Sequence, residues 1–79
     1  MGLAKTEKEL GDRASAYLKA KMKETGVTYA ELVKRLKKHG FAETEGSITM
    51  KLKRGTFNAT WFLAALVAIG AEVVKLEDI

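Results

Sequence analysis

The chain has 79 residues, a net charge of +4 at neutral pH, no cysteine, no proline and a single histidine, His39. This length predicts one domain over residues 1–79, with a core at 10–70 and a tail at 71–79. Without cysteine the chain can form neither a disulfide nor a thiolate metal site, and one histidine is too few for an imidazole-rich site. We expect no enzyme activity, no catalytic or metal-binding residues, no cofactor and no small-molecule substrate.

The start of the chain does not have the pattern of a signal peptide, because Leu3 and Ala4 are followed at once by charged residues. The longest apolar run, residues 61–69, is about half of the ~20 residues that a helix needs to cross a bilayer. We therefore expect a soluble cytoplasmic protein with no membrane partner.

The positive charge is concentrated in the middle of the chain. Residues 28–55 carry seven Lys and Arg against three Asp and Glu, so this stretch alone accounts for the net charge of +4. A basic segment within a neutral frame is typical of proteins that bind a polyanion. A solvated helix surface has a similar composition, so the charge alone leaves both interpretations open.

Apolar periodicity punctuated by glycines predicts four short helices. The first starts near Thr6 or Asp12 and ends before Gly26. The second starts at Thr28, which forms a capping box with Glu31. Its other start signal is a hydrophobic staple between Val27 and Leu32. It ends at Gly40, after three residues that suit the helix dipole, Lys37, Lys38 and His39. The apolar stripe of the first helix consists of Leu10, Ala14, Tyr17, Leu18 and Met22.

A connection at residues 41–46 leads to the third helix, which is capped by Thr44 or Ser47 and ends at Arg54. The fourth helix covers residues 59–69 after the N-cap Asn58. This helix is apolar nearly all round, so we expect it to be the central core helix. The predicted core consists of Leu18, Leu32, Leu36, Ile48, Leu52, Phe62, Leu66 and Ile69.

The tail is too apolar for a disordered end. Its β-branched pair, Val73 and Val74, favours a short strand, and a segment wrapped on a partner subunit is the alternative. The other apolar residues of the tail are Leu76 and Ile79.

The third helix has the outer face best suited to a groove. If Ile48 and Leu52 face the core, the 100° spacing of helical residues turns Gly46, Met50 and Lys53 outward. Small, hydroxyl-bearing and apolar side chains early in the helix, followed by Lys and Arg at its end, fit a helix that enters the major groove of DNA. An ordinary solvated amphipathic helix is the alternative.

Three stretches in this order carry a family resemblance: residues 28–33 (TYAELV), 47–55 (SITMKLKRG) and 61–70 (WFLAALVAIG). Together they resemble the lambda-repressor-like, xenobiotic-response-element class of helix-turn-helix domains, and the Ile-x-x-x-Leu spacing before Gly55 is closest to its Cro-type members. Residues 26–32 and 53–57 are also similar to a small bacterial family of unknown function with this fold. Over residues 10–70 the resemblance implies an all-α, four-helix domain that binds double-stranded DNA sequence-specifically, as a homodimeric transcription regulator.

The base-contacting face of that family falls here on Ser47, Thr49, Met50 and Lys53. The basic helices and the loop after the third helix supply the expected phosphate contacts, which are Lys37, Lys38, Lys51, Arg54, Thr56 and Asn58. One departure is the turn between helices two and three. Val33 stands where the family has alanine, and Gly40 follows seven residues later instead of four. This longer connection bears on the angle of the third helix.

Two other groups of residues have structural interpretations. Glu43 and Glu45 are spaced as an acid–base pair could be, but they lack a nucleophile or histidine partner, so we expect them to be solvated or to cap a helix. Phe57, Trp61 and Phe62 could stack on bases, although their helical spacing favours the core, with Phe57 possible at the surface.

Two functional alternatives stay open beside a sequence-specific regulator. One is a protein-interaction module, antitoxin-like or adaptor-like, that keeps the fold without binding DNA and uses the apolar tail. The other is a nonspecific nucleic-acid binder. The salt dependence of duplex binding distinguishes them, because salt weakens phosphate contacts.

Overall fold

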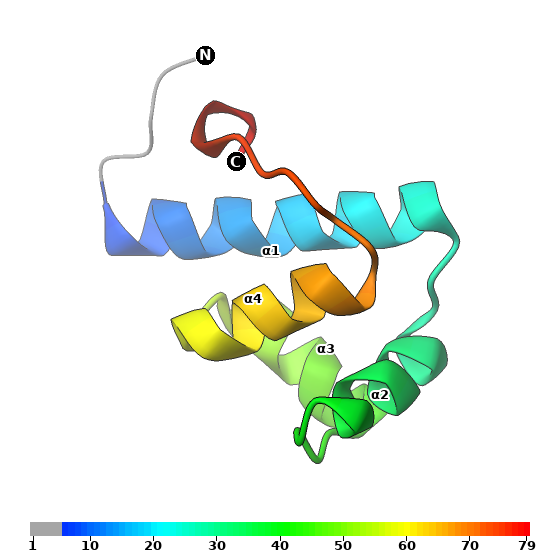
Figure 1. The fold of residues 1–79 in the computed structure, drawn as a ribbon. Coiled ribbons are helices and arrows are strands. Elements are labelled where there is room, and N and C mark those ends of the chain that lie inside the picture. The colour runs from blue at the N-terminus through cyan, green and yellow to red at the C-terminus, as the bar shows by residue number, and fades with distance from the viewer. Residues whose placement is uncertain (1–5) are drawn as a thin grey trace.

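The computed structural model describes residues 6–79, and these residues form four α-helices followed by one short 3-10 helix (Figure 1). The helices are α1 (Glu7–Thr25), α2 (Tyr29–Lys38), α3 (Glu45–Arg54), α4 (Ala59–Ala68) and the 3-10 helix η1 (Leu76–Asp78). The all-α, four-helix prediction is therefore confirmed for this part of the chain. Leu3 and Ala4, on which the signal-peptide expectation rests, lie outside the described residues.

A side-chain oxygen caps the start of each α-helix by accepting a hydrogen bond from the backbone N–H three residues later. The four caps are Thr6, Thr28, Thr44 and Asn58. The complete capping box is on α3, where the Ser47 hydroxyl also accepts from the Thr44 backbone N–H. On α2 the Glu31 carboxylate instead accepts from Arg35 Nε at 3.1 Å.

The core lies between the four α-helices, each of which contributes buried side chains. Figure 1 shows α1 running across the other three helices, with α2 beneath its C-terminal end. The largest fully buried side chains are Trp61, Leu18, Leu32, Leu36 and Ile48. All the predicted core residues are buried except Phe62, which is half-buried against the core.

The prediction that α4 is the central core helix is confirmed for one side of the helix only. One side of α4 faces the core through Trp61, Ala65 and Leu66, whereas Leu63 is 59% exposed and Val67 61% exposed on the other side. The chain has too few helices to cover both sides of α4. None of the helices within residues 6–79 is long and apolar enough to span a membrane.

The strand predicted for the tail is wrong, since the described residues contain no strand. A strand requires a neighbouring strand to hydrogen-bond with its backbone, and this all-helical domain offers none. Ala71 N instead donates to Leu66 O at 2.9 Å. The chain then crosses back to α1 (Figure 1), where Ile79 lies in a shallow hollow beside Tyr17.

The first half of α1 meets the end of α3 backbone to backbone, through Gly11 and Gly55. A Cβ atom on Gly11 would overlap the carbonyl oxygen of Gly55, and one on Gly55 would lie 2.8 Å from the Gly11 carbonyl carbon. Gly55 also has a φ of 66°, in the left-handed region that favours glycine. At this contact the backbones of α1 and α3 leave no room for a side chain between them.

We predict opposite effects for two helical glycine substitutions. Gly11→Ala should lower the free energy of unfolding by about 1–3 kcal/mol, because the new methyl group overlaps the Gly55 backbone. Gly46→Ala should raise it by about 0.5–1 kcal/mol, since alanine favours helix and the nearest atom to the new Cβ is Thr44 Oγ1 at 3.8 Å. Urea denaturation of both variants measures this, and equal stabilities for the two would contradict the close contact.

Candidate functional site

The outer side of α3 forms the candidate site. Ile48 and Leu52 are almost completely buried, at 0% and 2% exposure, as the sequence predicts. The opposite side presents Met50, which is 45% exposed, together with the exposed Gly46 and Lys53. Because two turns of α3 are anchored in the core, this outer face has a fixed position on the domain.

Three of the predicted base-contacting residues, Thr49, Met50 and Lys53, are exposed on α3. Thr49 Oγ1 donates a hydrogen bond to the Glu45 carbonyl at 2.9 Å, which leaves its lone pairs to accept from a ligand. Lys53 has no ion-pair partner among residues 6–79. These side chains offer an acceptor, an apolar surface and a positive charge along one helix face.

The fourth predicted base contact, Ser47, is half-buried and hydrogen-bonded within the domain. Its hydroxyl donates to Glu43 Oε1 at 2.6 Å and accepts from the Thr44 backbone N–H at 2.8 Å. Both functions of the hydroxyl are therefore used at the start of α3. Ser47 holds the helix in position.

Glu43 is a hydrogen-bonding centre at the start of α3, so of its two expected roles, solvation or capping, solvation is wrong. Its side chain is 7% exposed. Its carboxylate accepts from Lys51 Nζ at 2.8 and 3.0 Å, from the Ser47 hydroxyl, and from Trp61 Nε1 at 3.1 Å. The connection before α3 is thereby joined to both α3 and α4.

The environment of Glu43 favours its charged form. Burial raises the pKa of the carboxyl group, but hydrogen bonds from Lys51 and Ser47, the charge of Lys51 and the bond from Trp61 outweigh burial, so the pKa lies below its ordinary value. Lys51 Nζ also lies 5.6 Å from the centre of the Trp61 ring. The predicted phosphate contact Lys51 is thus ion-paired inside the domain.

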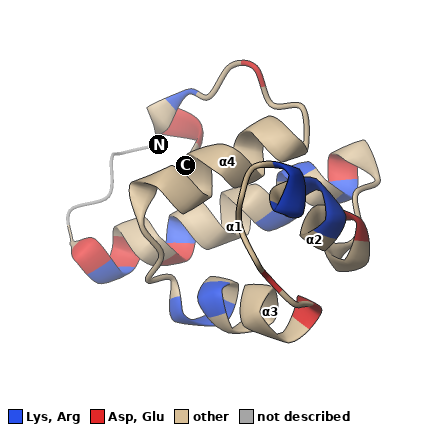
Figure 2. Ribbon diagram, turned by 60° about the horizontal axis from the view of Figure 1, so that its bottom comes forward, with Lys and Arg blue, Asp and Glu red and all other residues tan. Residues whose placement is uncertain are grey.

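The other predicted phosphate contacts lie in two places. Arg54 and Thr56 line a groove of about 390 Å³ beside Met50, whereas Lys37 and Lys38 are exposed at the end of α2. Figure 2 shows the Lys and Arg residues at the ends of α2 and α3 as two separate groups. The exposed positive charge therefore forms two groups, one at the end of α2 and one at the end of α3.

The last predicted phosphate contact, Asn58, caps α4. Its Oδ1 atom accepts from the Trp61 backbone N–H at 2.8 Å and from the Thr60 hydroxyl at 2.9 Å. Only its amide nitrogen is left to donate to a ligand.

Within residues 6–79 no group of His, Asp or Glu side chains is arranged to hold a metal ion. The sequence interpretation also missed two hydroxyl groups, those of Ser15 and Tyr29, which line a cleft between α1 and α3. The available signal was the position of Ser15, three residues before Leu18 on the buried stripe of α1.

Comparison with known proteins identifies a family for most of the chain. The model of a family described as "Domain of unknown function (DUF6471)" matches residues 10–74. No curated protein and no solved structure matches the chain. The similarity to a small family of unknown function is thus confirmed, and the lambda-repressor-like relationship stays a prediction.

We predict that Glu43→Gln lowers the free energy of unfolding at pH 7 by about 1–3 kcal/mol, because the charged hydrogen bonds to Lys51 and Ser47 are weakened. The pKa of Glu43 is lowered on folding, so its contribution is complete above the pKa of the unfolded chain and is lost as the pH falls through the folded value. Urea denaturation from pH 7 to pH 2 should therefore show the two proteins converging in acid.

The matched control is Glu45→Gln, which removes an exposed carboxylate from the same segment. We expect a change below about 1 kcal/mol, the size of a helix-dipole interaction. A difference between Glu43→Gln and the parent protein that stays constant in acid would contradict the charged network.

Proposed function

Because the chain belongs to the DUF6471 family of domains of unknown function, we propose its function from its geometry: sequence-specific binding of double-stranded DNA through α3. The observation that carries this proposal is the two-sided construction of α3. Its inner side is anchored by Ile48 and Leu52, and its outer side exposes Thr49, Met50 and Lys53. A helix held in this way can enter the major groove without losing its packing on the domain.

The exposed side chains of α3 match the chemistry of base edges. Met50 offers an apolar contact for a thymine methyl group, and Thr49 Oγ1 retains lone pairs that accept from a base amino group. Lys53 reaches either a guanine edge or a phosphate. Ser47 supports the outer face of α3 indirectly: its hydroxyl donates to Glu43, and this hydrogen bond holds the start of the helix in position.

The two basic groups fit the phosphate strands that border a groove. One group is at the end of α3, with Lys53 and Arg54, and the other is at the end of α2, with Lys37 and Lys38. A ten-residue helix is about 15 Å long, which is comparable to the ~12 Å width of the major groove. Thr56 and the Asn58 amide group can add phosphate contacts after α3.

The proposal includes a homodimer and a role in transcription regulation. A single domain of this size brings few side chains to the bases, so two copies on neighbouring half-sites supply the remaining affinity. The helix-turn-helix relationship belongs to the same proposal. It is supported by the order of the helices along the chain and by the packing of α3 against α1 and α2.

A protein-interaction module is the second candidate, and one observation favours it. Leu63 and Val67 are exposed on α4, a helix without a charged residue, and the tail exposes Val73 and Leu76. An apolar surface of this kind is typical of protein contacts. Selection of bound duplexes from a random pool distinguishes the candidates, since an enriched palindrome requires both base recognition and two-fold symmetry.

We predict that Lys53→Ala and Arg54→Ala each weaken binding to all duplexes and lower the slope of log affinity against log salt by about one unit. The physical reason is that each Lys or Arg side chain that contacts a phosphate releases about one counterion from the DNA. Fluorescence anisotropy over a salt series measures the slope. The control is Lys75→Ala, which removes the same charge from the tail and should leave the slope unchanged; equal slopes for all three variants would rule out this basic group.

We predict that Thr49→Ala and Met50→Ala reduce the preference for the selected site over a random duplex by about 1–3 kcal/mol. Both residues are exposed, so the variants should retain the helical circular dichroism of the parent. Leu63→Ala is the control, because it truncates an exposed apolar side chain on α4. If the first two variants keep full discrimination, α3 does not read bases and the protein-interaction candidate becomes the better one.

A further inference from the structure

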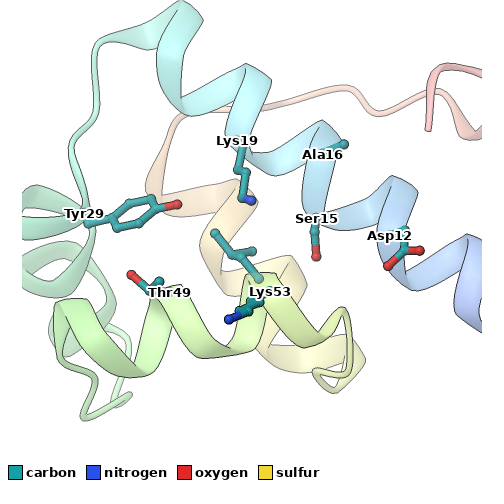
Figure 3. Close-up of a pocket in the computed structure, with 8 residues that line it drawn as sticks. Asp12, Ser15, Ala16, Lys19, Tyr29, Thr49 and Lys53 are labelled. Carbon is teal, nitrogen blue, oxygen red and sulfur yellow. The ribbon is translucent and has the colours of Figure 1, made fainter.

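A cleft between α1 and α3 contains a buried hydroxyl group without a partner. Ser15 is 4% exposed, and its Oγ atom makes no hydrogen bond within residues 6–79. A hydroxyl in a helix usually donates to the carbonyl four residues earlier, as Thr25 does to Lys21 at 2.8 Å. Ser15 does not use this route. Figure 3 shows its hydroxyl pointing from α1 toward α3, into the cleft.

The cleft has a volume of about 460 Å³ and brings together polar groups from three helices. Lys19 reaches down from α1 beside Ser15, Tyr29 extends its hydroxyl from the start of α2, and Lys53 belongs to α3 (Figure 3). The Tyr29 hydroxyl and both ammonium groups have no described partner in residues 6–79. The hydrogen-bonding capacity of the cleft is therefore largely unused.

The charges around the cleft favour an anion. Lys19 and Lys53 contribute two positive charges, and the one carboxylate at the edge, that of Asp12, already accepts from Lys8 at 2.8 Å. A hydroxyl that lacks a partner can donate to an anionic oxygen, which gives a stronger hydrogen bond than a neutral acceptor does. The hydroxyl and ammonium groups of the cleft can therefore donate hydrogen bonds to the oxygen atoms of an anion.

The directions of the donors distinguish between anions. Ser15 and Lys19 extend from α1 and Tyr29 extends from the start of α2, while Lys53 of α3 lines the same cleft. A planar carboxylate has two oxygens in one plane, whereas a tetrahedral phosphate presents oxygens in several directions and carries up to two charges. Two ammonium groups and two hydroxyls from three helices match the phosphate.

We propose that the α1–α3 cleft binds a phosphate group, with the Ser15 and Tyr29 hydroxyls donating to its oxygens and Lys19 and Lys53 balancing its charge. The phosphate belongs either to a free phosphorylated small molecule or to a strand of bound DNA. The second source rests on the proposed function, and the first does not. A phosphate bound in this cleft contacts both α1 and α3, so the occupancy of the cleft is linked to the position of α3.

The first test uses inorganic phosphate as the probe, with ionic strength held constant by chloride. Titration followed by ¹H–¹⁵N NMR should give saturable shifts concentrated on the amides of Ser15, Ala16, Tyr29 and Thr49. Ser15→Ala and Tyr29→Phe should each weaken phosphate binding about tenfold, the loss expected for one hydrogen bond to a charged acceptor. Shifts that do not saturate, or that all variants share, would overturn the free-phosphate source.

Matched variants separate a binding role from a structural one. Lys19→Gln should also weaken phosphate binding, because it removes a positive charge from the cleft. The controls are Tyr17→Phe, which removes a hydroxyl from α1 outside the cleft, and Lys23→Gln, which removes a positive charge from the end of α1. Neither control should change phosphate affinity. Ser15→Ala should also raise the thermal midpoint of the free protein, because it removes a buried hydroxyl without a partner. A lower midpoint together with unchanged phosphate affinity would mean that Ser15 serves packing alone, which overturns the proposal.

The second test repeats the variants with a DNA duplex. Weaker duplex binding by Ser15→Ala and Tyr29→Phe, with no response to inorganic phosphate, would assign the phosphate to the DNA strand. If no variant affects either ligand, the cleft binds no phosphate. Failure of the parent protein to bind any duplex would overturn the proposed function, while the inorganic phosphate titration would still decide the free source.

Discussion

The carboxylate of Glu43 lies where the connection after α2 meets α3 and α4, and the position of α3 depends on it. Its acceptor oxygens bind Ser47 at the first turn of α3, Lys51 one turn later and the indole N–H of Trp61 in the core. A connection of six residues between two helices permits many helix angles. The hydrogen bonds of the Glu43 carboxylate favour one of these angles. Each bond forms only when its donor on α3 or α4 points toward the carboxylate.

This arrangement explains how a domain without disulfides can present a short helix at its surface. α3 has only ten residues, too few to be stable alone in water. Ile48 and Leu52 provide apolar contact along one side, while Thr44 and Glu43 satisfy polar groups at the start. The exposed side chains of its outer side, Thr49, Met50 and Lys53, are then available for contact with a ligand.

Features encoded by neighbouring residues could be predicted from the sequence, and features encoded by distant ones could not. The caps at Thr28 and Asn58 and the inward side of α3 follow from spacings of three or four residues. Two of the three partners of Glu43, Lys51 and Trp61, are eight and eighteen positions away, and no local pattern links them to it. The apolar tail suggested a strand for the same reason, since strand formation depends on a partner elsewhere in the fold.

The Gly11–Gly55 contact has a mechanical consequence. Most packed helices are separated by side chains, which can change rotamer and absorb a small displacement of one helix. Here the two backbones touch, so there is no deformable layer between α1 and the end of α3. A shift of α1 by a fraction of an ångström must be passed on to the last turn of α3 or must open the junction. We therefore expect a displacement of α1 at this pair of glycines to be transmitted directly to the last turn of α3.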